Sequence, residues 1–149
     1  MWMQEEWRYE MKFLIAALVL ICGSVSAQTY QAGDLTLTDA FSYPTTGRSG
    51  AGYFTLTNDG AADALLDVEA DYPKVMLHKS MMKDGVMTME HQMRVVVPPQ
   101  GEIEFAPGGY HVMFMGLKEG WGVGDDIKAT LIFEKSGSLE VTFKVIERP

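Results

Sequence analysis

From residue 28 onward, apolar and polar positions alternate along the chain in short runs that end at turn residues. The runs LTLTDAFSY (35–43), AGYFTLTN (51–58), IKATLIFE (127–134) and SLEVTFKVI (138–146) all show the period of two that is typical of half-buried strands. No window carries a helical stripe of useful length, and no linker or repeat divides the pattern. The sequence therefore predicts a single all-β domain, an antiparallel β-sandwich of eight or nine strands.

The first 27 residues have the pattern of an export signal. The apolar run from Phe13 to Cys22 is too short to span a bilayer, and small residues follow it. Val25 and Ala27 fit the positions three and one before a cleavage site. Because the residues before Met11 are acidic and aromatic, whereas a signal begins with basic residues, Met11 is the expected natural start. We therefore expect a signal peptide over 1–27, a mature domain over 28–149 and a periplasmic location.

The expected mature segment is acidic and contains no cysteine. Its net charge is −7 with histidine neutral, which argues against nucleic acid and anionic membrane surfaces as partners. The chain's one cysteine, Cys22, follows the bulky Ile21, which argues against a lipid anchor and so against stable membrane attachment. Without cysteine there is no disulfide, thiolate nucleophile or thiolate metal ligand. The scattered acidic residues show no paired-carboxylate pattern for acid–base catalysis, so the chain is not predicted to be an enzyme.

A methionine-rich segment, HKSMMKDGVMTMEHQM (78–93), contains a short hairpin signal. Asp84-Gly85 lies between two apolar-rich runs, which favours a two-residue turn in which Lys83 pairs with Val86. The resulting register pairs His78 with His91, Ser80 with Met89 and Met82 with Met87, all on one face. Directly opposite residues have Cβ atoms about 4.5–5.5 Å apart. Local geometry alone therefore gathers imidazole and thioether groups on one face.

A second stripe of the same chemistry occurs in PGGYHVMFMG (107–116). His111, Met113 and Met115 occupy alternate positions of one expected strand, so they share a face. This face is either part of the core, with one misfit imidazole, or part of a site for a soft ion. Hard cations require oxygen ligands, and zinc is served better by cysteine, histidine and carboxylate. Thioether with imidazole favours copper, particularly Cu(I).

The spacing of these residues resembles a known motif. Ten residues separate His78 from Met89, twenty-one separate Met89 from His111, and one separates His111 from Met113. This spacing resembles the His–Met motif of the periplasmic copper chaperones called PCuAC. The surrounding sequence is also similar to that of the family, in KDGVMTM (83–89) and PGGYHVMFMGLK (107–118). The resemblance implies a cupredoxin-like Greek-key β-sandwich that binds one Cu(I) through these four side chains. It also implies delivery of copper toward the CuA centre of cytochrome c oxidase, with oxidase subunit II and thioredoxin-like copper-delivery proteins as partners.

Several alternatives stay open at this stage. His91 is outside the family's pattern, and it is an additional ligand, a group that supports a ligand or a solvated rim residue. Met81, Met82, Met87 and Met115 are expected to fill the core or wall of the domain. A copper storage or resistance protein would use the same ligands, and a structural sandwich with a methionine-rich core would bind no metal. A blue-copper electron carrier requires a cysteine thiolate, and four protein ligands leave no open position for a copper enzyme.

Overall fold

The computed structural model describes residues 27–149. The start expected at Met11, Cys22 and the rest of the expected signal up to residue 26 lie outside this range. Within it, no helix is long and apolar enough to cross a membrane. The regular structure of the described residues consists of strands, in agreement with the period of two along the sequence.

Eleven strands make up the described part of the chain. Their bounds are β1 Tyr30–Ala32, β2 Leu35–Ser42, β3 Ser49–Asn58, β4 Asp63–Glu69, β5 Lys74–Lys83, β6 Val86–His91, β7 Val95–Val97, β8 Gly101–Phe105, β9 Tyr110–Met115, β10 Asp126–Phe133 and β11 Gly137–Val145. The expected number of eight or nine was too low. Strands β1 and β7 have only three residues each, and three residues are too few to show a period.

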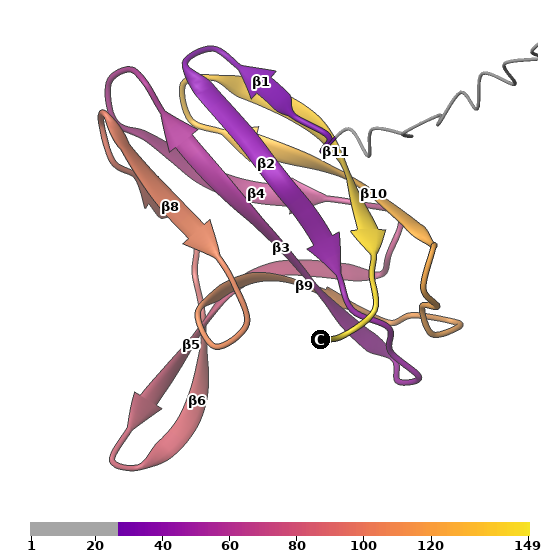
Figure 1. Ribbon diagram of the computed structural model, residues 1–149. Coiled ribbons are helices and arrows are strands. Elements are labelled where there is room, and N and C mark those ends of the chain that lie inside the picture. Colours follow the sequence, from indigo (N-terminus) through magenta and orange to yellow (C-terminus); the bar gives the residue numbers. More distant parts are fainter. Residues whose placement is uncertain (1–26) are drawn as a thin grey trace, which may run out of the picture.

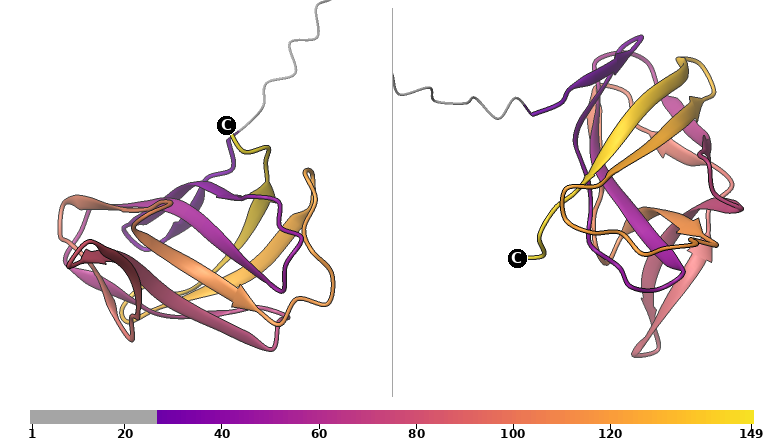
Figure 2. Two further views of the ribbon diagram at one scale, coloured as in Figure 1. Left: turned by 90° about the horizontal axis from the view of Figure 1, so that it is seen from below. Right: turned by 90° about the vertical axis from the view of Figure 1, so that its right-hand side faces the viewer.

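The strands form a β-sandwich whose layers enclose one core (Figures 1 and 2). The hydrogen-bonded order is β6-β5-β9-β8-β3-β2-β11-β10-β4-β7, and β9 also pairs with β3. The expectation of a purely antiparallel sheet was wrong, because β11 runs parallel to β2 and β8 runs parallel to β9. The β5–β6 hairpin stands at one end of this order and projects from the body (Figure 1).

Aromatic rings fill the centre of the sandwich. Phe54 stacks on Phe105 with ring centroids 4.3 Å apart, and Phe114 packs edge-on against Phe143 and Trp121. Each fully buried side chain of this size contributes roughly 1.5–3 kcal/mol relative to exposure. In β9, the residues that face this core are Val112 and Phe114, both with no exposed area. The alternate positions 111, 113 and 115 therefore point away from the core, and the interpretation of this stripe as a core face was wrong.

A buried carboxylate joins the start of β4 to the β10–β11 turn. Asp63 accepts hydrogen bonds from the backbone N–H groups of Ala64, Lys135 and Ser136 and from the Ser136 hydroxyl, at 2.6–3.0 Å. Burial acts to raise the pKa of Asp63, but these four hydrogen bonds outweigh burial and hold the pKa below its usual value. The carboxylate form is therefore the one that the fold favours.

Replacing Asp63 with alanine is expected to lower the free energy of unfolding by about 2–3 kcal/mol, because buried donors lose a charged acceptor. Since the folded pKa is depressed, this contribution is present above the ordinary carboxyl pKa of 3.8 and is lost as the pH falls below it. Urea unfolding at pH 7 and pH 3 measures both effects. Asp67→Ala is the control, because exposed Asp67 makes one local bond to the Val68 N–H. Equal effects of the two substitutions would contradict the expectation.

Candidate metal centre

The methionine-rich hairpin has the register that the sequence predicts. Asp84 and Gly85 both have positive φ, 52° and 76°, as a two-residue hairpin turn requires. The pairs are Lys83 with Val86, Met82 with Met87, Ser80 with Met89 and His78 with His91. The turn therefore fixes which side chains of β5 and β6 share a face.

Strand β9 brings the second stripe beside the first. It pairs antiparallel with β5, and it places His111 directly opposite His78 and Met113 directly opposite Met76. His78 consequently lies between two other imidazoles. Its ring centroid is 5.7 Å from that of His111 and 6.1 Å from that of His91. His111 and Met113 lie far along the chain from Met89, and they reach the hairpin because β5 is hydrogen-bonded to both β6 and β9.

The turn between β8 and β9 sets the tautomer of His111. Gly108 has φ +85°, and the Gly109 N–H donates to the Ala106 carbonyl at 3.0 Å, which closes a tight turn. The Gly109 carbonyl then accepts from the Ser80 N–H at 3.0 Å and from His111 Nδ1 at 3.1 Å. Because a carbonyl can only accept, Nδ1 carries the proton and Nε2 carries a lone pair. A backbone carbonyl commonly orients a metal-binding histidine in this way.

Two imidazole nitrogens in this cluster are buried without any hydrogen-bond partner. They are Nε2 of His111 and Nδ1 of His78. Only 4% of His111 is exposed. Buried polar atoms in native proteins are nearly always satisfied, so two such atoms on facing residues require an explanation. A metal ion that accepts both lone pairs would supply it, and the donor set therefore fits a metal.

The electrostatic surroundings of His78 favour its neutral form. Burial lowers its pKa most, and the neighbouring His111, His91 and Lys74 lower it further. A neutral imidazole has the lone pair that coordination needs. His78 is therefore ready to bind a cation near neutral pH.

The two thioethers differ in exposure. Met113 is half-buried on β9, between Met76 of β5 and Ala51 of β3. Met89 lies on the hairpin, diagonal to His78, and 57% of it is exposed. Across residues 27–149, no three His, Cys, Asp or Glu side chains form a group that could hold a metal ion. A metal ion at this cluster would therefore need thioether donors beside the imidazoles.

The structure also revises the surroundings of the cluster. Met81, Met82 and Met87 are exposed, so of the two expected places, core or wall, the core was wrong for these three; Met115 is half-buried. His91 is exposed and lies directly opposite His78. Met76 was missed by the sequence reasoning, although it alternates with His78 on the same strand. Because Met76 lies opposite Met113, it supplies a further thioether at the edge of the cluster.

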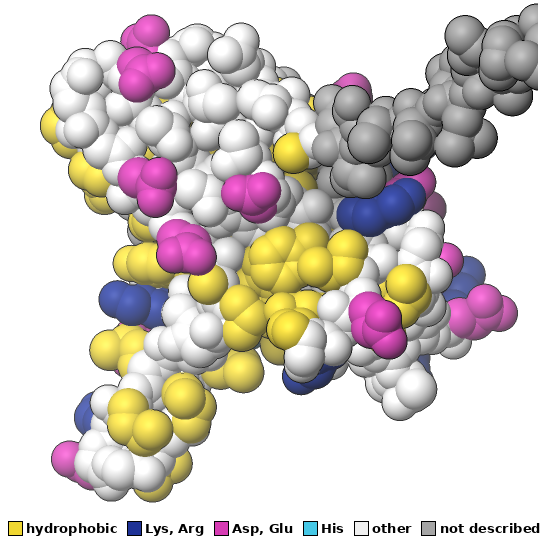
Figure 3. Space-filling view, viewed as in Figure 1, with side chains coloured by type: hydrophobic (Ala, Val, Ile, Leu, Met, Phe, Trp, Pro, Cys, Tyr) yellow, Lys and Arg dark blue, Asp and Glu magenta, His cyan; other side chains and the backbone are white. Residues whose placement is uncertain are grey.

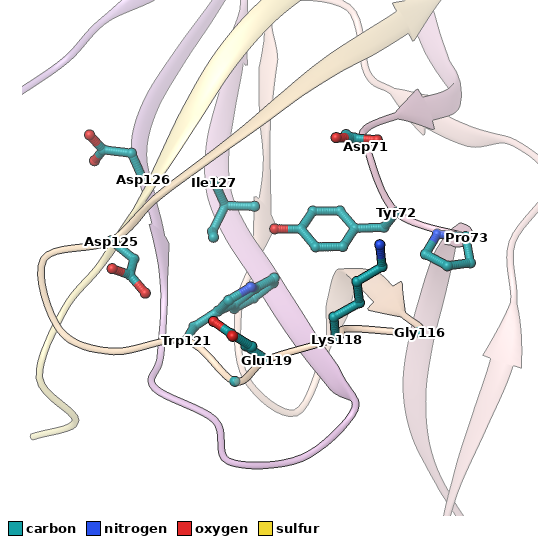
Figure 4. Close-up of a pocket in the computed structure, with 11 residues that line it drawn as sticks. Asp71, Tyr72, Pro73, Gly116, Lys118, Glu119, Trp121, Asp125, Asp126 and Ile127 are labelled. Atoms are coloured by element: carbon teal, nitrogen blue, oxygen red, sulfur yellow. The ribbon is translucent and has the colours of Figure 1, made fainter.

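A separate pocket of about 810 Å³ lies next to the aromatic end of the core (Figure 4). It is lined by Tyr72, Trp121 and several carboxylates, and it contains none of the histidines or methionines described above. Two of its four carboxylates have partners: Asp125 accepts from the Gly122 N–H at 2.8 Å, and Asp126 forms an ion pair with Lys144 at 2.8 Å. The imidazole and thioether donors of the cluster therefore lie outside this pocket.

The sequence matches the family model "Putative lipoprotein LpqE-like" over residues 35–145. The chain belongs to the LpqE-like family. A curated relative, the putative lipoprotein Lxx21020 of Leifsonia xyli subsp. xyli (strain CTCB07), is 31% identical over 90 residues, which cover 60% of this chain and 54% of the relative. The chain thus spans about half the length of that relative. The family's description names lipoproteins. The expectation of no lipid anchor rests on Ile21 and Cys22, which lie outside the described part of the chain, and it stays a prediction.

Solved structures share the fold of this LpqE-like chain. A copper-bound PCuAC domain from PmoF2 is 22% identical, with a TM-score of 0.68, and covers 81% of this chain and 99% of its own. An apo PCuAC domain from PmoF1 is 22% identical, with a TM-score of 0.69 and coverages of 81% and 100%. Cu(I)-bound DR1885 from Deinococcus radiodurans is 26% identical, with a TM-score of 0.55 and coverage of 83% of both chains. The resemblance to PCuAC domains and the predicted fold class are confirmed.

Proposed function

We propose that this LpqE-like protein is an exported, periplasmic copper chaperone that binds one Cu(I) through His78, Met89, His111 and Met113. The observation that carries the proposal is the buried, unpartnered Nε2 of His111, held ready by the hydrogen bond from Nδ1 to Gly109. The copper-bound relatives of the same fold support a copper ligand. The family's description as lipoproteins supports export.

The donor set favours Cu(I) over other biological cations. All four proposed ligands are neutral, and thioether sulfur is a soft donor that hard cations such as calcium and magnesium do not prefer. His78 and His111 are held on adjacent, hydrogen-bonded strands, so their ring positions are set by the fold. The unbranched methionine side chains can adjust to the ion. The arrangement combines two fixed nitrogen donors with two adaptable sulfur donors.

The exposure gradient across the ligands suits transfer. Met89 is more than half exposed and stands on the projecting hairpin, whereas His111 is almost fully buried. An incoming donor from an acceptor protein can therefore replace Met89 first and reach His111 last. Stepwise replacement from Met89 to His111 favours delivery over long-term storage, because a storage site gains nothing from an exposed ligand. We propose that the protein is not an enzyme and that its acceptor route leads to the CuA centre of cytochrome c oxidase, through subunit II and thioredoxin-like copper-delivery proteins.

The test is an anaerobic Cu(I) titration of residues 28–149 against a chromophoric chelator, followed by transfer. We expect one tightly bound Cu(I) per chain. We also expect that copper to move to an apo CuA domain of oxidase subunit II. The CuA absorption should then appear once the acceptor is filled and oxidised. Copper that is bound tightly but not released to the CuA domain would favour storage or resistance. Absence of tight binding would favour the structural sandwich.

A further inference from the structure

The tip of the β5–β6 hairpin carries an unusual concentration of exposed apolar side chains. Ten large hydrophobic residues are exposed in the part of the chain that the structure describes, and six of these lie between positions 81 and 93. Met82 is 66% exposed and Met87 is 53% exposed. The space-filling view shows hydrophobic side chains along the projecting hairpin (Figure 3). Packing in the core does not explain them.

The register places three thioethers on one face of this tip. Lys83 and Val86 flank the two-residue turn and form its hydrogen-bonded pair, so the next pair, Met82 with Met87, is the closer, non-hydrogen-bonded kind. Their Cβ atoms are then about 4.5–5.5 Å apart. Met89 is two residues along β6 from Met87 on the same face, roughly 6.6–6.8 Å away. Three flexible bonds per methionine allow the sulfur atoms to converge.

No hard donor competes on this face of the tip. Ser80 shares the face but is buried, at 9% exposure. Lys79 and Glu90 alternate onto the opposite face, together with Met81 and Thr88. The face presents neutral, soft thioether sulfur, and this donor set selects a soft monovalent ion such as Cu(I).

We propose that Met82 and Met87 form a second, weaker Cu(I) site at the hairpin tip, and that Met89 is shared because it ligates copper at the tip when it is not bound to copper in the four-residue site. The inference rests on the proposed function, because the shared Met89 connects the two sites. An apolar docking surface is the competing explanation, and leucine would serve that purpose as well as methionine.

The test is an anaerobic titration with Cu(I), buffered by a weak chelator, of protein labelled with ¹³C at the methionine methyl groups. In the wild type we expect a second equivalent that shifts the Met82 and Met87 methyl signals after the first equivalent has bound. Met82→Leu/Met87→Leu should weaken the second equivalent by at least tenfold and change the affinity for the first by less than twofold. Met81→Leu, on the opposite face of β5, is the control and should leave both equivalents unchanged.

The outcomes separate this inference from the proposed function. A wild type that binds only one equivalent, or a double variant that retains the second, overturns the tip site and leaves the four-residue site intact. The proposed function is overturned instead if the wild type does not bind the first equivalent of Cu(I), or if His111→Ala leaves the affinity for that equivalent unchanged. Since Met82 and Met87 are exposed, an unchanged thermal midpoint is expected and confirms that the double variant is folded.

Discussion

Replacing His111 with alanine is expected to weaken Cu(I) binding by at least about 100-fold, because even groups that only support a metal ligand contribute 10- to 100-fold. His111 supplies a buried Nε2 lone pair with no other partner, and its ring is oriented by the Gly109 carbonyl. Because only 4% of His111 is exposed, water does not readily take its place. Competition with a chromophoric Cu(I) chelator measures the affinity.

The matched control is His91→Ala. His91 faces His78 at a ring distance similar to that of His111, but it is exposed on the edge strand β6. We expect less than about a threefold change in Cu(I) affinity, in line with the small effects of exposed substitutions. A loss equal to that of His111→Ala would assign His91 to the ligand set. Thermal unfolding of both apo variants separates a loss of binding from a loss of folding.

Lowering the pH from 7 to 5 is expected to weaken Cu(I) binding by roughly tenfold, because a protonated imidazole cannot coordinate and each pH unit below its pKa costs tenfold in the neutral form. Burial, His111, His91 and Lys74 lower the pKa of His78, so proton competition at this ligand begins below its ordinary value of 6.5. The decline should therefore be shallow near pH 6.5 and steeper toward pH 5.

The same shift has a consequence for the apo protein. Because the folded pKa of His78 is depressed, its contribution to stability is present above pH 6.5 and is lost as the pH falls through the folded pKa. Affinity and apo stability at pH 7, 6 and 5 are measured on the same samples, with the chelator's own protonation taken into account. An affinity that stays constant over this range would count against histidine ligation.

Local sequence patterns were sufficient to predict the hairpin register and the all-β fold class. Asp84-Gly85 has the backbone conformation that its turn type requires, so the pairing of His78 with His91 and Ser80 with Met89 follows without any tertiary information. Alternation along β9 likewise predicts that positions 111 and 113 share a face. These features depend on neighbours along the chain, which the sequence displays directly.

Features that depend on packing between distant segments could not be predicted from local sequence patterns. The placement of β9 beside β5, which sets His111 opposite His78, joins positions 33 residues apart and was implied only by the family's spacing. The parallel pairings of β2 with β11 and β8 with β9 leave no local signal. The exposure of Met82 and Met87 was misjudged because a thioether suits a core and a soft-metal site equally well.

The carbonyl of Gly109 is shared between the base of the hairpin and the buried imidazole, since it accepts from both the Ser80 N–H and His111 Nδ1. The Gly109 carbonyl oxygen thus connects the projecting β5–β6 hairpin to His111, the most buried of the four proposed ligands. If a partner displaced the hairpin at Ser80, the same oxygen would carry that displacement to the bond that orients the His111 ring. Under the proposed function, docking at the hairpin and release of the deepest ligand would thus be coupled through a single main-chain atom.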